Sequence, residues 1–205
     1  FVTPLSMVWV LTYLKELIPG WSWKIKFVDQ LIEFFKGYRT HMAWAMMGLA
    51  VVLGVYTGIL LSAFNARPLW NTSILGPLFL VSGMSTGLAA IIWMSKNHTE
   101  RTILSKIDLV LILVELFLIV HLFMGFLAAT EVQIESAQLF LGGEFTVTLW
   151  VYVIILGLIL PAFLETLELF GTKIPMWIPS LLILIGGLMF RFVMVEAGQI
   201  TRYLY

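Results

Sequence analysis

The chain has 205 residues, of which 60% are hydrophobic and 12% are charged, compared with roughly 25% charged residues in soluble domains. Its twelve basic and twelve acidic residues cancel, so no net charge favours nucleic acid or another polyanion as a partner. Because the chain has no cysteine, it offers no thiolate for an iron–sulfur cluster and no disulfide. The composition predicts a polytopic membrane protein.

Six long stretches with few or no charges are predicted to be membrane spans. They cover residues 1–14, 42–63, 74–94, 109–130, 145–164 and 174–195. Five of them reach the ~20 residues that a helix needs to cross the hydrocarbon. The first is shorter and lacks the basic leader of a signal peptide, so we expect the incomplete end of a spanning helix. Long apolar runs without period-2 alternation do not form a barrel, so the expected fold class is an all-α polytopic transmembrane bundle.

Basic residues are distributed unevenly between the connections. Two of them, Arg67 and Arg202, lie on one side of the predicted bundle, and nine lie on the other. The nine are Lys15, Lys24, Lys26, Lys36, Arg39, Lys96, Arg101, Lys106 and Lys173. By the positive-inside rule, the side with nine faces the cytoplasm, and the C-terminus lies outside. In the first cytoplasmic connection, residues 27–36 are amphipathic, which predicts a short helix on the membrane interface.

Three ionisable residues interrupt the predicted spans, namely Glu115, His121 and Arg191. A charged group near the bilayer centre costs about 3 kcal/mol or more, so each one needs a compensating interaction. One interpretation is that Arg191 pairs with an acid only to hold helices together. The other is a proton path, or a polar ligand pocket that faces the outer side. The sequence leaves both interpretations open.

The three histidines do not suit a haem. His41 lies at the cytoplasmic end of a predicted span and His121 lies towards the outside, whereas two axial ligands of one haem share a depth. His98 falls in a connection. We therefore expect no haem and no metal site in this chain.

Small residues and a proline indicate how the helices pack. Gly54-x-x-x-Gly58 and Gly83-x-x-x-Gly87 have the spacing that lets two helices approach closely in a membrane. Pro161 has no N–H to donate, so we expect a kink in its helix.

The most specific stretch runs from Tyr56 to Asn71. Tyr56 is predicted to lie within reach of the outer headgroups, and a phenol in hydrocarbon needs a hydrogen-bond partner. With the small Gly58 beside it, the phenol can donate to a ligand carbonyl, but it can equally well bond to a neighbouring helix. Asn65 and Arg67 belong to the polar outer loop that follows.

At this stretch the sequence resembles the NrfD/PsrC family, the membrane subunits of polysulfide reductase, nitrite reductase and related respiratory complexes. The family pattern Tyr-x-Gly followed by Asn-x-Arg-Pro-Leu-Trp-Asn matches residues 56–71. Residues 187–199 are similar to the last helix of the family and read Gly-Leu-Met-Phe-Arg-Phe-Val-Met-Val-Glu-Ala-Gly-Gln. Residues 4–9, Pro-Leu-Ser-Met-Val-Trp, are similar to the start of its third helix. The resemblance covers essentially the whole chain.

The resemblance implies an arrangement in two four-helix bundles. Residues 1–65, including the interfacial helix 27–36, would complete the first bundle, and residues 66–205 would form the second. The first two helices of the family pattern are missing here. In the family these helices contribute polar residues to the quinone site beside the tyrosine, so that site would be incomplete on this chain alone.

The resemblance also implies a quinone-reactive anchor of a respiratory oxidoreductase in a prokaryotic cytoplasmic membrane, without a redox centre of its own. Electrons would pass between menaquinone or ubiquinone and a four-cluster, ferredoxin-like iron–sulfur subunit at the outer face, accompanied by further catalytic or cytochrome subunits. The quinone pocket and outer loop would comprise Tyr56, Gly58, Asn65 and Arg67. Proton transfer or charge stabilisation would fall to Glu115, His121 and Arg191.

Two other functions fit the same residues. A solute transporter or channel would use the intramembrane polar residues to bind its solute, although no inverted repeat is visible in the sequence. A purely structural anchor needs no working site. The quinone-reactive anchor differs from both because it predicts a co-purifying iron–sulfur partner and bound quinone.

Overall fold

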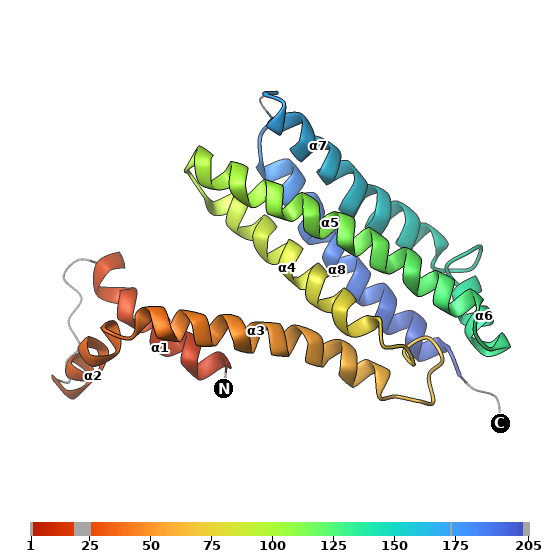
Figure 1. The fold of residues 1–205 in the computed structure, drawn as a ribbon, viewed down its shortest axis with the longest axis horizontal. Helices are drawn as coiled ribbons and strands as arrows, with labels where there is room; N and C mark the ends of the chain where they lie inside the picture. The colour runs from red at the N-terminus through yellow and green to blue at the C-terminus, as the bar shows by residue number, and fades with distance from the viewer. Residues whose placement is uncertain (1, 19–25, 173, 203–205) are drawn as a thin grey trace. The chain divides into compact units, whose positions relative to one another are not determined.

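The computed structural model describes residues 2–18, 26–172 and 174–202, and these ranges contain helices and no strand (Figure 1). Phe1, Lys24 and Lys173, which the predicted spans and topology use, lie outside the described residues. The helices are α1 (Val2–Leu17), α2 (Lys26–Lys36), α3 (Arg39–Ser62), α4 (Leu75–Met94), α5 (His98–Leu127), α6 (Glu131–Gln138), η1 (Thr148–Ile159), α7 (Leu160–Leu169) and α8 (Trp177–Ile200). The predicted all-α fold class is confirmed.

Five helical segments are long and apolar enough to span a membrane. They are α3, α4, α5, the continuous segment of η1 and α7, and α8, while α1 contains a shorter apolar run over Val2–Leu14. These segments confirm the prediction of a polytopic helical protein with five full-length spans and one short one. The helix predicted over residues 27–36 is also present as α2, and its position on the interface stays a prediction.

The chain forms two compact units, residues 1–54 and 55–205, and each is described by itself. Because α3 runs continuously across residue 54, it begins in the first unit and ends in the second. The predicted grouping into residues 1–65 and 66–205, as parts of two four-helix bundles, stays a prediction.

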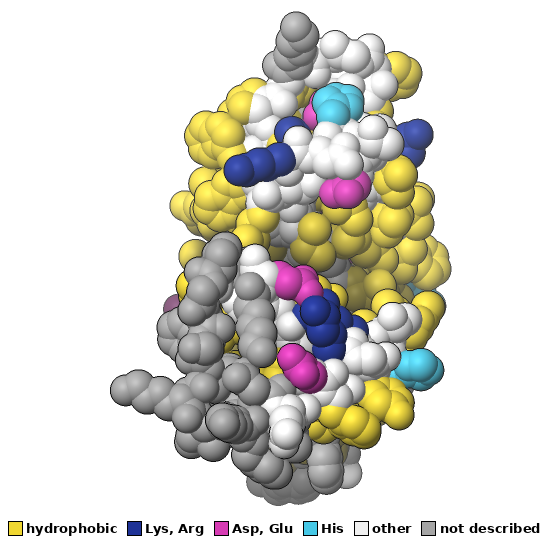
Figure 2. All heavy atoms as spheres, turned by 90° about the vertical axis from the view of Figure 1, so that its left-hand side faces the viewer, with side chains coloured by type: hydrophobic (Ala, Val, Ile, Leu, Met, Phe, Trp, Pro, Cys, Tyr) yellow, Lys and Arg dark blue, Asp and Glu magenta, His cyan; other side chains and the backbone are white. Residues whose placement is uncertain are grey.

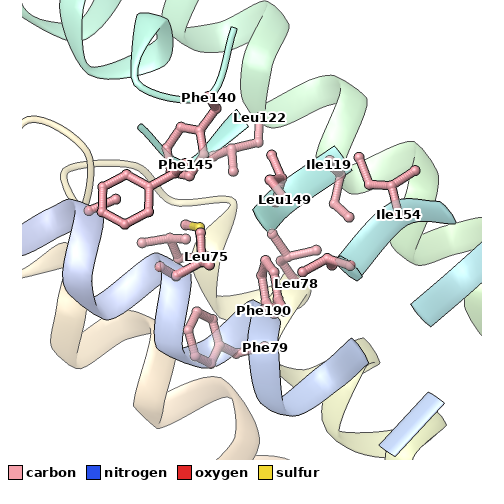
Figure 3. Close-up of a cluster of buried hydrophobic side chains, with 14 of the residues drawn as sticks. Leu75, Leu78, Phe79, Ile119, Leu122, Phe140, Phe145, Leu149, Ile154 and Phe190 are labelled. Atoms are coloured by element: carbon pink, nitrogen blue, oxygen red, sulfur yellow. The ribbon is translucent and has the colours of Figure 1, made fainter. Parts of the chain in front are cut away.

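The second unit is built around one apolar core. Helix α8 packs against η1 and α4, and α4 packs against α5 (Figure 1). Figure 3 shows large side chains from all of these helices meeting at the centre. They include Leu78 and Phe79 of α4, Ile119 and Leu122 of α5, Leu149 and Ile154 of η1, and Phe190 of α8, all buried. Because lipid is as apolar as these side chains, close packing rather than the hydrophobic effect holds such a core together in a membrane.

Two glycines bring η1 and α8 into backbone contact. A Cβ atom on Gly157 would lie 2.6 Å from the Cα of Gly186, so larger residues do not fit at this crossing. Helix η1 has π-helical hydrogen bonding, in which the N–H of Leu160 donates to the carbonyl of Ile155, five residues back. The chain returns to α-helical geometry as α7, which has Pro161 in its first turn. The position predicted for a kink is therefore the position where the type of helix changes.

Two spans extend further towards the predicted cytoplasmic side than the sequence suggests. Helix α5 begins at His98 rather than at residue 109, and α7 ends at Leu169 rather than at residue 164. The predicted spans stop at charged residues, whereas the helices continue past Asp108 and Glu165, which lie inside the bundle and are each 0% exposed. Both helices therefore carry a carboxyl group within the packed part of the structure.

We expect the connection between α6 and η1 to face the outside and the connection between α4 and α5 to face the cytoplasm, because nine of eleven basic residues in or beside the connections lie on the latter side. The variant Glu144→Cys should react with a membrane-impermeant maleimide in intact cells, whereas His98→Cys should react only in broken cells. Both positions are exposed, and the protein has no other cysteine to label. The opposite labelling pattern would overturn the topology.

Candidate functional site

The loop between α3 and α4, which is predicted to face the outside, is held against the C-terminal part of α8 by a tryptophan. Trp70 is buried, and its indole Nε1 donates a 2.9 Å hydrogen bond to the carbonyl of Met194. The same indole lies against Gly198, where a Cβ atom would overlap the ring. The two sequence segments that carry the family resemblance, residues 56–71 and 187–199, therefore meet in space.

Arg67 ties the same loop to the last turn of α8. Its Nη1 donates to the carbonyl of Gln199 and, at 2.8 Å, to the carbonyl of Thr201. The last carbonyls of a helix lack intrahelical partners and carry partial negative charge, so a cation there stabilises the helix end by about 0.3–1 kcal/mol. Arg67 thus has partners within this protein, while Asn65 in the same loop is exposed.

Tyr56 and Gly58 lie on different faces of α3. Tyr56 is 54% exposed and shares its face with Ile59 and Leu60, which are also exposed. Gly58 is buried against α4, and a Cβ atom there would lie 2.5 Å from the Cα of Gly76. The space at Gly58 is therefore occupied by the backbone of α4. Among the four predicted quinone-site residues, the structure buries Gly58, leaves Arg67 half-buried in the loop after α3, and exposes Tyr56 and Asn65.

Glu115 and Arg191 occupy the same interior region of the second unit. Glu115 is 2% exposed, and it interacts with Ser82 of α4 and with the charge of Arg191. The Nη1 of Arg191 donates a 2.6 Å hydrogen bond to the carbonyl of Gly187 in its own helix. Its Nη2 lies over Gly83, where a Cβ atom would be 3.7 Å away. The two glycines leave room for the guanidinium group between α4 and α8.

The structure does not place His121 beside Glu115. His121 is exposed, and its ring stacks on that of Phe117 with 5.9 Å between the ring centroids. Phe117 is itself 65% exposed, so this pair lies on the face of α5 that points away from the bundle. Of the three intramembrane residues predicted to act together, two are brought together.

Two further acids, Asp108 and Glu165, are fully buried in the same bundle, and neither is among the sequence-predicted site residues. A signal for Asp108 is present in the sequence, because Ser105, Asp108, Ile112 and Glu115 recur with helical spacing and share the buried face of α5. Ending the predicted span at the first charge conceals this pattern. Glu165 follows Pro161 by one turn, and both face inwards.

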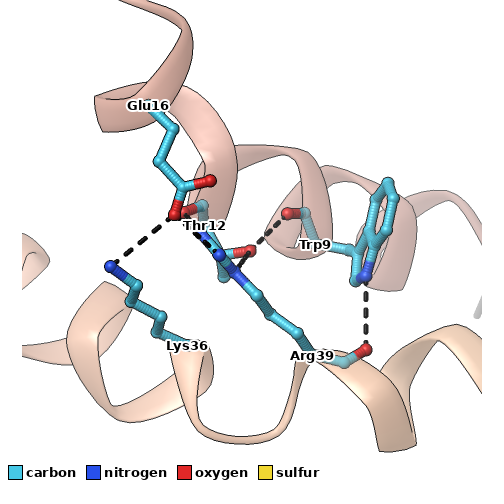
Figure 4. A network of polar contacts seen from close by, with 5 residues as sticks. All are labelled: Trp9, Thr12, Glu16, Lys36 and Arg39. Carbon is cyan, nitrogen blue, oxygen red and sulfur yellow. Dashed lines mark hydrogen bonds and ion pairs between the residues drawn. The ribbon is translucent and has the colours of Figure 1, made fainter. Parts of the chain in front are cut away.

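The first unit contains a separate polar network centred on Arg39, shown in Figure 4. The Nη1 of Arg39 contacts Glu16 at 2.8 Å, its Nε donates to Thr12 Oγ1 at 3.0 Å, and its Nη2 donates to the Thr12 carbonyl. Lys36 approaches the same Glu16 carboxylate at 3.6 Å. The indole of Trp9 donates to the Arg39 carbonyl at 3.3 Å. This network links α1 to the end of α2 and the start of α3.

No solved structure matches the chain significantly, but protein sequences do. The family model described as "Polysulphide reductase, NrfD" matches residues 1–202. The chain belongs to the NrfD family. It is 34% identical over 197 residues to Protein NrfD of Escherichia coli, covering 92% of this sequence and 62% of that protein. It is also 34% identical over 163 residues to the C subunit of polysulfide reductase from Wolinella succinogenes, covering 74% of this sequence and 51% of that protein.

The NrfD homolog of Haemophilus influenzae is 31% identical over 209 residues, which cover 95% of this sequence and 65% of that protein. The chain therefore spans between about half and two thirds of the length of these relatives. The predicted membership of the NrfD family is confirmed, as is a multi-pass membrane protein. In the described part of the protein, no three His, Asp or Glu side chains are grouped to hold a metal ion.

We expect Gly58→Ala to destabilise the second unit, because the added Cβ atom would overlap the backbone of α4 at Leu75 and Gly76. Overpacking of this kind costs about 1–3 kcal/mol. Gly48→Ala is the matched control, since it lies in the same helix with nothing within 4 Å of the added atom. Thermal unfolding in detergent measures the difference, and equal midpoints for the two variants would contradict this packing.

We expect the first unit to loosen in acid through Glu16. The hydrogen bond from Arg39 lowers the pKa of the Glu16 carboxyl, so the ion pair stabilises the fold above the ordinary carboxyl pKa and is lost as pH falls through the lowered value. Hydrogen exchange in α1, corrected for intrinsic rates, should rise on acidification in the wild type. The Glu16→Gln variant should lose most of this pH dependence. The same change at exposed Glu131 is the control, and an unchanged pH response in Glu16→Gln would contradict the assignment.

Proposed function

We propose that this protein is the quinone-reactive membrane anchor of a respiratory oxidoreductase. It would exchange electrons between a menaquinone or ubiquinone pool in the membrane and an iron–sulfur subunit at the outer face. The observation that carries this proposal is the NrfD family match over residues 1–202, together with the relative from polysulfide reductase. Because the sequence has no cysteine, iron–sulfur clusters would be ligated by the partner subunit.

The exposed face of α3 is the proposed quinone-binding surface. Tyr56, Ile59 and Leu60 give this face one phenol hydroxyl among apolar side chains. Such a face can hydrogen-bond a quinone carbonyl while the isoprenoid tail stays in lipid. The relatives are longer than this sequence, and we propose that part of their additional length covers this face and completes the site.

The other predicted site residues would support Tyr56 indirectly. Gly58 lets α3 pack directly on α4, which sets the depth of the phenol. Arg67 holds the outer loop on α8, so the exposed Asn65 is presented near the outer end of α3. We propose that these contacts fix the outer rim of the site, where an iron–sulfur partner would dock.

Glu115 and Arg191 are proposed to stabilise charge or transfer protons during quinol chemistry. Support comes from their shared position inside the bundle, where charges are costly unless they have a use or a partner. His121 lies on the exposed face of α5, away from the bundle, so any part it takes in proton transfer would be separate from Glu115 and Arg191.

We expect Tyr56→Phe to lower quinone-linked turnover several-fold while the complex still assembles. The change removes only the hydroxyl, and a neutral hydrogen bond contributes about 0.5–1.5 kcal/mol, or more if charge develops on the ligand. Tyr152→Phe is the matched control, because Tyr152 is 49% exposed on a different helix. Reduction of the iron–sulfur partner by an artificial donor should stay intact in both variants. Normal quinone turnover in an assembled Tyr56→Phe complex would place the quinone site elsewhere.

A further inference from the structure

A row of acidic side chains runs through the interior of the second unit. From the predicted cytoplasmic end it contains Glu168 and Glu165 on α7, then Asp108 and Glu115 on α5. Successive members interact electrostatically with one another, and the row ends at Arg191 on α8. Glu165 and Asp108 are 0% exposed and Glu115 is 2% exposed. The row therefore passes through the packed interior rather than along the surface.

Serine hydroxyls accompany the row on the helices that face it. From α4, Ser85 faces Asp108 and Ser82 faces Glu115. Ser105 of α5 and Ser180 of α8 are also completely buried. Among the described residues, none of these four hydroxyls and neither carboxyl group of Asp108 and Glu165 makes a hydrogen bond of ordinary length and angle, although Ser85 and Ser82 lie near enough to Asp108 and Glu115 to interact with them. Buried polar groups are almost always bonded to protein or to ordered water, so we expect bound water beside these groups.

The row opens at the predicted cytoplasmic end of the bundle. A cavity of about 430 Å³ lies there, lined by His98, Arg101, Thr102 and Glu168 among others. Arg101 and Glu168 form an ion pair of 3.7 Å on its wall, with side chains 24% and 13% exposed. In the upper part of Figure 2, basic, acidic and histidine side chains lie among polar atoms and are bordered by hydrophobic side chains. We call this cavity the vestibule, and it connects solvent to Glu168, the first member of the row.

The charges along the row do not resemble those of a structural ion-pair network. The described charged groups that face it are Glu168, Glu165, Asp108 and Glu115, with Arg101 at one end and Arg191 at the other. Helix α4 contributes only serines to it. No described base faces Glu165 or Asp108, so these two neighbouring carboxyl groups are not both charged in a low-dielectric interior, because burying unpaired charge is too costly. At least one of these carboxyl groups therefore carries a proton.

We propose that the row is a proton-conducting half-channel from the vestibule to Glu115 in the bundle. A proton from solvent passes the Arg101–Glu168 pair to Glu165 and then to Asp108, and each carboxyl group accepts one proton and releases one, with no electron moved. Asp108 and Glu115 are about 10 Å apart along α5, too far for direct transfer. Waters bonded to Ser85 and Ser82 bridge this step. The half-channel is argued from the second unit alone and does not depend on the role of Tyr56.

The test measures how fast the Glu115 carboxyl exchanges its proton for deuterium. The protein, purified with any subunits that accompany it, is moved into D2O, and the carboxyl bands are followed by infrared spectroscopy. The band lost in Glu115→Gln identifies the residue. Asp108→Asn and Glu165→Gln should each slow its exchange on the order of 100-fold, because each removes one titratable member of the relay. Glu100→Gln, at an exposed position near the vestibule, should leave it unchanged.

Two further variants separate proton conduction from a structural role. Asp108→Glu keeps a carboxyl group and should restore most of the exchange rate that Asp108→Asn loses. Unchanged exchange in both Asp108→Asn and Glu165→Gln, in variants that unfold at the wild-type temperature, would overturn the half-channel. So would slow exchange that Asp108→Glu does not rescue.

Two other observations would also count against the proposal. If no carboxyl band disappears in Glu115→Gln, then Glu115 is a permanent ionised partner of Arg191 and not a proton acceptor. If replacing choline chloride with sodium chloride at constant ionic strength shifts the carboxyl bands or slows the exchange, then the row binds sodium ions. We expect one band at Glu115 and no effect of sodium. Because no quinone is needed, these outcomes are independent of turnover in Tyr56→Phe.

Discussion

Bilayer hydrocarbon offers no hydrogen bonds, and this constraint determines the backbone geometry of the spanning helices and the inward position of most of their charged side chains. The backbone satisfies it by helix formation, and the side chains satisfy it by facing the bundle. On α5, Asp108 and Glu115 face inwards, while Leu113 and Phe117 are exposed. The interior of the second unit therefore contains both its best-packed apolar side chains and its buried carboxyl and serine hydroxyl groups. In a soluble protein of this size, apolar side chains would also fill the interior, but most polar groups would lie on the surface.

Close backbone approach takes the place of the hydrophobic effect in holding these helices together. Gly58 brings α3 against α4, and Gly157 with Gly186 brings η1 against α8. Gly83 and Gly187 serve a different purpose, since they leave space for the Arg191 guanidinium between α4 and α8. The same small residue thus makes helix contacts at some positions and accommodates a charge at others.

The two ends of the second unit differ in character. At the end predicted to face the outside, Trp70 and Arg67 bond to carbonyls in the last turns of α8, and this joins the loop after α3 to the C-terminal segment. At the other end, a vestibule with the Arg101–Glu168 ion pair leads to buried acids without hydrogen-bond partners. The first of these ends has fixed geometry, which is consistent with the proposed docking and quinone-binding surface. The opposite end holds the vestibule of the proposed half-channel.

The membrane class, the all-α fold, the full-length spans and the family could all be predicted from the amino-acid sequence. These follow from the length of the apolar runs and from motifs such as residues 56–71, which are local properties of the sequence. Which polar residues share an interior became clear from the packing of the helices in the tertiary structure. It joined Glu115 to Arg191, left His121 on the surface, and added Asp108 and Glu165, because the direction of a side chain depends on which helix packs against it. It also showed that Arg67 caps α8, a contact between residues far apart in the sequence that no local pattern specifies.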